Sequence, residues 1–68
     1  MNTKLLGQIL KERREKLGLT QLEVARQVWV SQSVLSRWEN GRREIGLSNF
    51  LALCSLYRIE PGKVLGKV

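Results

Sequence analysis

The chain has 68 residues and a formal net charge of +6, with 12 lysines and arginines against six acidic residues, all of them glutamate. This length allows one domain, and an apolar content of 43% favours a folded domain over a disordered basic tail. Histidine, aspartate, a glycine-rich phosphate loop and a cluster of metal ligands are all missing, so we expect neither an enzyme nor a metal or cofactor site.

The basic charge fits a polyanionic partner, although ribosomal, membrane-surface and nucleic-acid-binding proteins share this bias. A single cysteine forms no internal disulfide, which fits a reducing cytoplasm. No segment approaches the run of about 18 apolar residues that a membrane span needs, and the N-terminus lacks a signal-peptide core. We therefore expect a cytoplasmic, nucleoid-associated protein with no membrane contact and no small-molecule ligand.

The first element is expected to be an amphipathic helix over about residues 4–17. Gly18 is expected to end it, since glycine favours the position that follows a helix. Apolar and arginine side chains recur along it at steps of three and four residues. They are Leu6, Ile9, Leu10, Arg13, Arg14 and Leu17.

Residues 20–40 read as two short helices joined by a tight turn. Thr20 and Glu23 have the spacing of a capping box, which marks the start of the first helix of the pair. Leu22, Ala25 and Val28 then give that helix one apolar face. The small Ala25 in the middle of the face allows a second helix to approach closely.

The second helix of this pair is expected to begin after Ser31, a good N-cap, and to end at Asn40-Gly41. At about 100° per residue, five polar side chains share an arc of about 140°, and the opposite side holds Val34, Leu35, Trp38 and Glu39. Such groups suit hydrogen bonds with base edges and phosphates better than a merely solvated face, which is usually rich in Lys-Glu pairs. The five are Gln32, Ser33, Ser36, Arg37 and Asn40.

A fourth helix is expected over about residues 47–57 and a fifth over 61–65, where Pro61 suits the first helical position. The fourth helix is apolar around much of its circumference, so neighbouring helices or a second subunit should cover it. Cys54 lies on its apolar face and is expected to be a buried structural thiol. No strand pattern is visible, so the expected fold is all-α. The face of the fourth helix consists of Leu47, Phe50, Leu51, Cys54 and Tyr57, extended by Leu53 and Leu56.

The run from Leu19-Thr20-Gln21 through Ala25, Val28 and Val30-Ser31 to Leu35-Ser36-Arg37-Trp38-Glu39-Asn40-Gly41 resembles the helix-turn-helix of the XRE family, which includes the phage Cro and cI repressors. The resemblance extends from about residue 6 to residue 65. It implies a compact five-helix, lambda-repressor-like domain over residues 1–68 that binds double-stranded DNA. We expect a transcriptional regulator, in particular a repressor, that inserts the helix over 32–40 into the major groove.

Within this expectation Gln32, Ser33 and Arg37 read bases, because glutamine pairs with adenine and arginine with guanine. The resemblance implies that Gln21 bonds a phosphate with its side chain and backbone, and that Arg14 and Glu39 form a largely buried ion pair. Phosphate contacts are also expected from Ser36, Asn40, Arg42, Arg43 and, as a weaker candidate, Arg13.

Members of the XRE family bind palindromic half-sites as two-fold dimers, which implies a homodimer here. We expect its contacts in the C-terminal half, at Leu56, Val64 and Val68. Two positions depart from the glycine that is usual in the family: Trp29 in the turn and Arg58 after the fourth helix. Simple local packing is the favoured role for Trp29, with an exposed anchor for another protein as the alternative.

A rival function stays open, in which the domain is an antitoxin or interaction module whose main partner is a protein. Trp29 and the apolar fourth helix would support it. RNA binding is disfavoured, because the chain has four aromatic residues and no basic strip interleaved with them.

Overall fold

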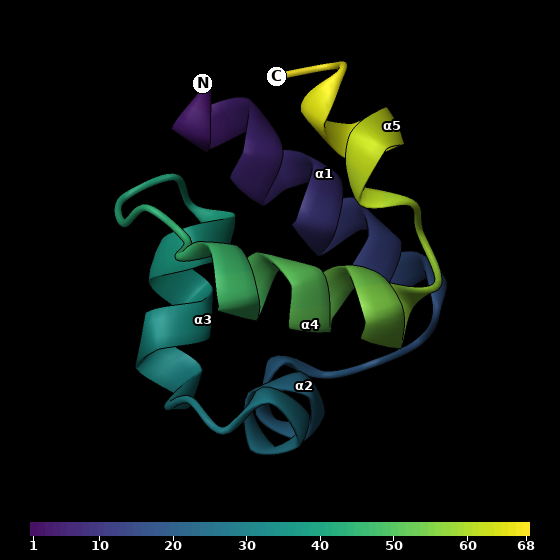
Figure 1. The fold of residues 1–68 in the computed structure, drawn as a ribbon. Helices are drawn as coiled ribbons and strands as arrows, with labels where there is room; N and C mark the ends of the chain where they lie inside the picture. Colours follow the sequence, from purple (N-terminus) through teal and green to yellow (C-terminus); the bar gives the residue numbers. More distant parts are fainter.

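Five helices and no strand build the protein, and the computed structural model describes all 68 residues (Figure 1). The all-α prediction is therefore confirmed. The first helix begins and ends one residue before its predicted range, and the last two span the ranges predicted for them. The helices are α1 (Thr3–Lys16), α2 (Gln21–Val28), α3 (Gln32–Glu39), α4 (Leu47–Tyr57) and α5 (Pro61–Leu65).

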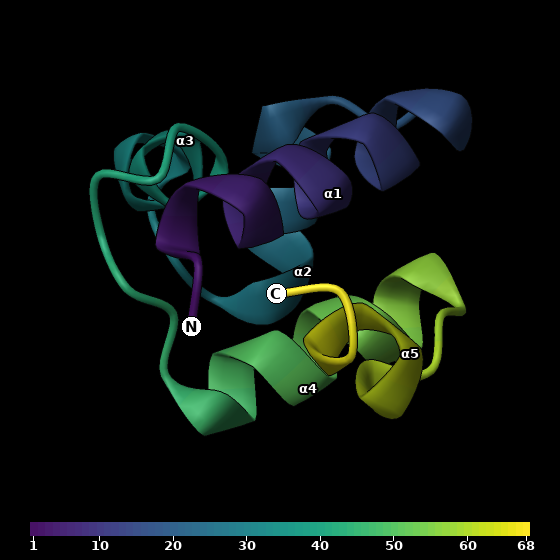
Figure 2. The ribbon, with the colours of Figure 1, turned by 90° about the horizontal axis from the view of Figure 1, so that it is seen from above.

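Helix α1 lies in the middle of the fold and contacts α3, α4 and α5. In Figure 1 helix α3 lies on the left and α5 at the upper right, and Figure 2 again places them on opposite sides of the molecule. Every helix contributes to one apolar core, in which eleven residues are buried. They are Leu6, Leu10, Val24, Ala25, Leu35, Trp38, Phe50, Leu53, Cys54, Tyr57 and Val64.

Side-chain caps define where the first three helices begin. Asn2 accepts a hydrogen bond from the backbone N–H of Leu5 at 2.9 Å, and Ser31 accepts one from Val34 at 3.2 Å. Thr20 and Glu23 form the complete reciprocal capping box. These bonds satisfy backbone donors that a helix start otherwise leaves free. The predicted starts thus have a direct physical cause.

The buried face of α2 differs from the prediction, and α4 leaves part of its apolar face exposed. Leu22, expected in the apolar face of α2, is 44% exposed, and Val24 is fully buried in its place. On α4, Leu47 and Leu51 were expected to be covered by neighbouring helices or by a second subunit; they are 70% and 44% exposed, so the neighbouring helices leave them uncovered. A short helix touches the core through a narrow arc, so apolar residues at the edge of that arc stay in solvent.

Gly7 lets α1 approach the end of α3 closely. A Cβ atom at this position would lie 2.1 Å from the carbonyl oxygen of Trp38 and 2.8 Å from that of Glu39. Main-chain atoms cannot move aside as a flexible side chain can. The crossing of α1 and α3 therefore depends on a residue without a side chain at position 7.

The two departures from glycine keep the backbone conformation that glycine would have. Trp29 has φ 62° and ends α2, and Arg58 has φ 56° and ends α4. Each backbone N–H bonds back into the preceding helix. A left-handed conformation costs a residue with a side chain roughly 1–2 kcal/mol, so the turns keep their shape at some expense of stability.

Candidate nucleic-acid interface

The outer side of α3 is polar and accessible. Gln32, Ser33 and Arg37 are all exposed, while Leu35 and Trp38 on the opposite side are buried. The three side chains predicted to read bases thus face solvent together. Their donors and acceptors are of the kinds that pair with base edges in the major groove.

The other predicted phosphate contacts around α3 lie at its C-terminal end and in the loop beyond it. Asn40 is exposed, and its Nδ2 donates a hydrogen bond of 3.4 Å to the hydroxyl of the half-buried Ser36. Arg42 and Arg43 are exposed in the loop between α3 and α4. They place two guanidinium groups beside the end of α3, where they can bind phosphate oxygens.

The ion pair implied by the resemblance is present inside the molecule. Nε of Arg14 donates to Glu39 at 2.7 Å and a second guanidinium nitrogen donates at 3.1 Å, so the contact is bidentate. A third bond of 2.8 Å joins Arg14 to the carbonyl oxygen of Leu19. The hydrogen bonds to Glu39 raise the pKa of Arg14, although burial acts in the opposite direction. The pair ties α1 to the end of α3.

Gln21 belongs to the same network. Its Nε2 donates a hydrogen bond of 2.9 Å to Oε1 of Glu39, so this side chain is half-buried and already has a partner within the protein. The expectation that Gln21 bonds a phosphate with its side chain stays a prediction, since its Oε1 and the second Nε2 hydrogen have no partner within the protein. Its backbone N–H remains one of the free donors of the first turn of α2, where an anion can bind.

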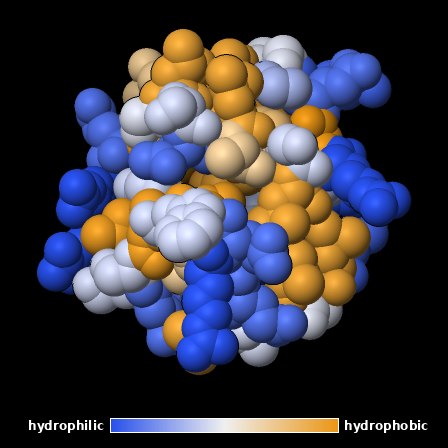
Figure 3. Space-filling model, turned by 60° about the horizontal axis from the view of Figure 1, so that its bottom comes forward, coloured by the Kyte–Doolittle hydropathy of each residue, from blue (hydrophilic) through white to orange (hydrophobic).

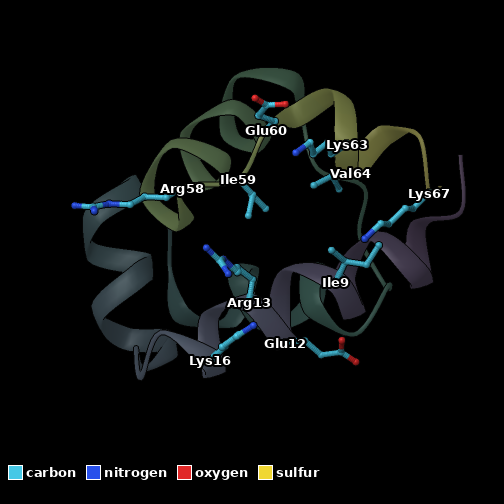
Figure 4. A pocket seen from close by; sticks show the side chains of 10 residues that line it. All are labelled: Ile9, Glu12, Arg13, Lys16, Arg58, Ile59, Glu60, Lys63, Val64 and Lys67. Carbon is cyan, nitrogen blue, oxygen red and sulfur yellow. The ribbon is translucent and has the colours of Figure 1, made fainter.

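Arg13 lies apart from the other predicted phosphate contacts. Its Nε donates a hydrogen bond of 3.0 Å to the carbonyl oxygen of Tyr57, at the end of α4. Figure 4 shows its side chain between α1 and the segment that joins α4 to α5. Arg13 therefore stabilises a helix C-terminus, and the structure does not group it with α3.

Trp29 lies in the turn that leads into α3, and it is 93% exposed. The expected local packing is therefore wrong, because the indole covers nothing. The sequence showed that Trp29 occupies a position where glycine is usual. It could not show the exposure of the indole, which depends on the residues around the turn in space. Figure 3 views the molecule from the side that carries α2 and shows separate hydrophobic areas (orange) among hydrophilic surface (blue).

The residues predicted for a subunit contact are largely used within the monomer. Val64 is 5% exposed and belongs to the core, while Leu56 and Val68 are half-buried against it. Val64 therefore offers little surface for such a contact, because a short final helix has to bury its apolar side to pack at all. Exposed apolar surface in this half comes instead from Leu47, Leu51 and Leu65.

Three buried groups carry no reactive feature. Cys54 is 1% exposed, as expected, and burial raises the pKa of its thiol, which disfavours the nucleophilic thiolate. The hydroxyl of Tyr57 and Nε1 of Trp38 are buried without a hydrogen-bond partner. Burial also raises the pKa of Tyr57.

None of the five helices has the length and apolarity to cross a membrane.

The helix-turn-helix family model matches residues 10–64. Repressor protein C2 of Salmonella phage P22 is 35% identical over 65 residues, which cover 96% of this chain and 30% of that protein. The HTH-type transcriptional regulator ImmR of Bacillus subtilis is 37% identical over 62 residues, with 91% and 49% covered. Antitoxin PezA of Streptococcus pneumoniae is 32% identical over 63 residues, with 93% and 40% covered. The chain thus spans half or less of these relatives.

Solved structures show the same fold. The DNA-binding domain of the P22 C2 repressor has a TM-score of 0.84 at 35% identity, covering 96% of this chain and 86% of that one. The restriction-modification controller protein C.AhdI of Aeromonas hydrophila also has a TM-score of 0.84, at 32% identity, covering 91% and 94%. Family model, relatives and fold agree, and the chain therefore belongs to the helix-turn-helix family, in its XRE or Cro/cI-type group.

Proposed function

We propose that this protein is a sequence-specific DNA-binding transcriptional regulator, most simply a repressor, which inserts α3 into the major groove. The observation that carries the proposal is the exposed polar side of α3. Gln32, Ser33 and Arg37 face solvent there, while the opposite side of the helix is packed into the core. Related proteins of the same fold include a repressor and a transcriptional regulator. A domain of this kind performs no chemistry on DNA, so we propose no enzymatic activity, and a cytoplasmic location follows from the same role.

In this proposal Gln32 and Arg37 select bases, and Ser33 approaches a base edge or a phosphate. Asn40, Arg42, Arg43 and the N–H groups at the start of α2 hold the phosphates on both sides of the groove. The ion pair between Arg14 and Glu39 keeps α3 at a fixed angle to α1. Positioning and reading are thus assigned to separate residues.

The proposal is tested by selecting bound sequences from a random pool of duplex DNA and then measuring affinity for every single-base variant of the selected site. Gln32→Ala and Arg37→Ala should each cost about 1–3 kcal/mol at the cognate site and relax preference at one base pair. Arg42→Ala should lower the affinity for all DNA sequences alike and lower the salt dependence of binding. If the first two variants keep the preference of the wild type, the assignment of base-reading roles is wrong.

We also propose that the protein binds as a homodimer through its C-terminal half, on half-sites about one helical turn apart. The apolar groups available for such a contact are Leu47, Leu51 and Leu65, which are between 42% and 70% exposed. Analytical ultracentrifugation with and without the selected DNA tests this. A monomer under both conditions would contradict it, and Leu47→Glu should abolish dimers without unfolding the domain.

A second candidate function is favoured by Trp29, which follows α2 and is 93% exposed. Buried aromatic anchors carry much of the energy of protein interfaces, and one relative is an antitoxin. In this alternative Trp29 docks into a partner protein, and DNA binding is secondary. A pull-down from the source cells with wild type and Trp29→Ala, followed by a DNA gel shift with the same two proteins, distinguishes the two functions.

A further inference from the structure

A groove of about 630 Å³ lies between α1, the end of α4 and α5 (Figure 4). Its apolar side chains are Ile9, Ile59 and Val64, which come from three different segments of the chain. In Figure 4 these three lie around the middle of the groove. The groove therefore combines an apolar floor with open access from solvent.

Charged side chains make up the rest of the groove, and most of them are cationic. Five cations and two carboxylates give the lining a net charge of +3, which is half of the +6 carried by the whole chain. The cations are Arg13, Lys16, Arg58, Lys63 and Lys67, and the carboxylates are Glu12 and Glu60.

These cations form no ion pair within the molecule. The one ion pair of the structure joins Arg14 to Glu39, so neither Glu12 nor Glu60 lies within 4 Å of a groove cation. Like charges held close together oppose the folded state, and a bound anion relieves that repulsion. The arrangement therefore favours an anionic ligand over a neutral one.

The groove is separate from the proposed DNA-binding surface. It is built on α5, and Figures 1 and 2 place α5 and α3 on opposite sides of the molecule. No aromatic residue lines the groove, so it offers no platform on which the bases of a single strand could stack. It also lacks the serine, threonine, asparagine and glutamine donors that often accompany phosphate contacts.

We propose that this groove is a binding site for an acidic amphipathic segment of a protein, with apolar side chains on one face and carboxylates on the other. The apolar face contacts the partly exposed Ile9 and Ile59, and the carboxylates lie against Lys63, Lys67 and Arg13. This is the helix-in-groove mode of recognition, with charge complementarity added at the rim. The regulator can then hold DNA and an acidic partner at the same time, since the two surfaces are apart.

The test uses a synthetic amphipathic peptide with leucines on one face and glutamates on the other. It is titrated into isotope-labelled protein, and backbone amide shifts are followed by NMR. Shifts should concentrate at the groove, around Ile59 and Val64, and persist when the selected DNA is bound. The double variant Lys63→Gln/Lys67→Gln should weaken binding about tenfold. Both lysines are exposed, so this variant should melt at the temperature of the wild type or, with less charge repulsion, slightly above it.

The matched control is Lys4→Gln/Arg26→Gln, which removes two exposed cations outside the groove. Equal weakening by both double variants would mean general attraction by the net charge and would overturn the proposal. So would equal affinity for a peptide of glutamates without leucines, because the apolar floor would then play no part. If duplex DNA displaced the peptide and shifted the same backbone amides, the groove would be assigned to nucleic acid instead. The comparisons of the two double variants and of the two peptides do not depend on whether α3 reads DNA.

Discussion

The two halves of this small fold are held together in different ways. Helices α2 and α3 each begin at a side-chain cap, and a buried network of Arg14, Glu39 and Gln21 fixes the end of α3. Helices α4 and α5 have no side-chain cap, and α4 instead buries Phe50, Leu53, Cys54 and Tyr57. A helix whose outer side must stay polar has little apolar area to bury, so directed hydrogen bonds hold it in place.

Glu39→Ala should have the largest effect, because it breaks the polar half of this comparison. Removing one partner of a buried ion pair leaves the other charge uncompensated and costs about 3–5 kcal/mol. Urea denaturation at neutral pH measures the loss, with Glu15→Ala, an exposed carboxylate on α1, as the control. A variant that unfolds at the urea concentration of the wild type would show that the network does not hold α3.

Leu53→Ala tests the apolar half. Leu53 is 1% exposed, so its truncation should create a cavity and cost about 2–5 kcal/mol in the same urea experiment. Leu51→Ala on the same helix is the matched control for the monomer, where Leu51 is 44% exposed and its truncation should change stability by about 0.5 kcal/mol or less. Equal losses from both would mean that the exposed side of α4 is covered in solution, as in a dimer.

Trp29→Gly and Arg58→Gly should each raise stability by about 1 kcal/mol, because glycine adopts a positive φ without a steric cost. Little burial is lost, since both side chains are exposed. Differential scanning calorimetry should show a higher Tm for each. Trp29→Ala, which retains the strain but removes the ring, should not gain stability. A lower Tm for the glycine variants would indicate that these side chains make stabilising contacts.

Glu23→Gln, in the capping box of α2, should give the smallest effect, and this effect depends on pH. The backbone N–H of Thr20, and then its hydroxyl, lower the pKa of Glu23. Its ionised form is therefore stabilised in the folded state at neutral pH, and this contribution disappears as the pH falls through the lowered pKa. Glu23→Gln should unfold slightly below the wild type at pH 7 and together with it at acid pH. A constant difference would contradict this, and Thr20→Ala should cost about 1 kcal/mol.

Local signals explain why the helices could be predicted. Thr20, Ser31 and Pro61 act on backbone groups within a few residues of themselves, so their effect can be read without the rest of the fold. The same holds for the polar arc of α3, whose outward orientation follows once Leu35 and Trp38 are buried.

What depends on distant neighbours could not be predicted from local patterns. The ion pair joins residues 25 positions apart, and it was expected from a family resemblance and not from spacing. Leu22 and Val24 lie on different sides of α2, about 160° apart on the helix wheel, and only the packing of α3 and α4 decides which side is covered. The hydrogen bond from Gln21 to Glu39 and the exposure of Trp29 were missed for the same reason.

The close contact at Gly7 sets the angle between α1 and α3, and with it the orientation in which α3 would lie on DNA. The carbonyl groups of Trp38 and Glu39 rest directly on the α1 backbone there, so even one added methyl group must tilt the two helices apart. Gln32 and Ser33 lie at the opposite end of α3 from this contact, so a small change in the angle between the helices displaces both side chains. Substitutions at position 7 should thus alter operator choice from the far side of the core, and a screen for shifted specificity should include this residue.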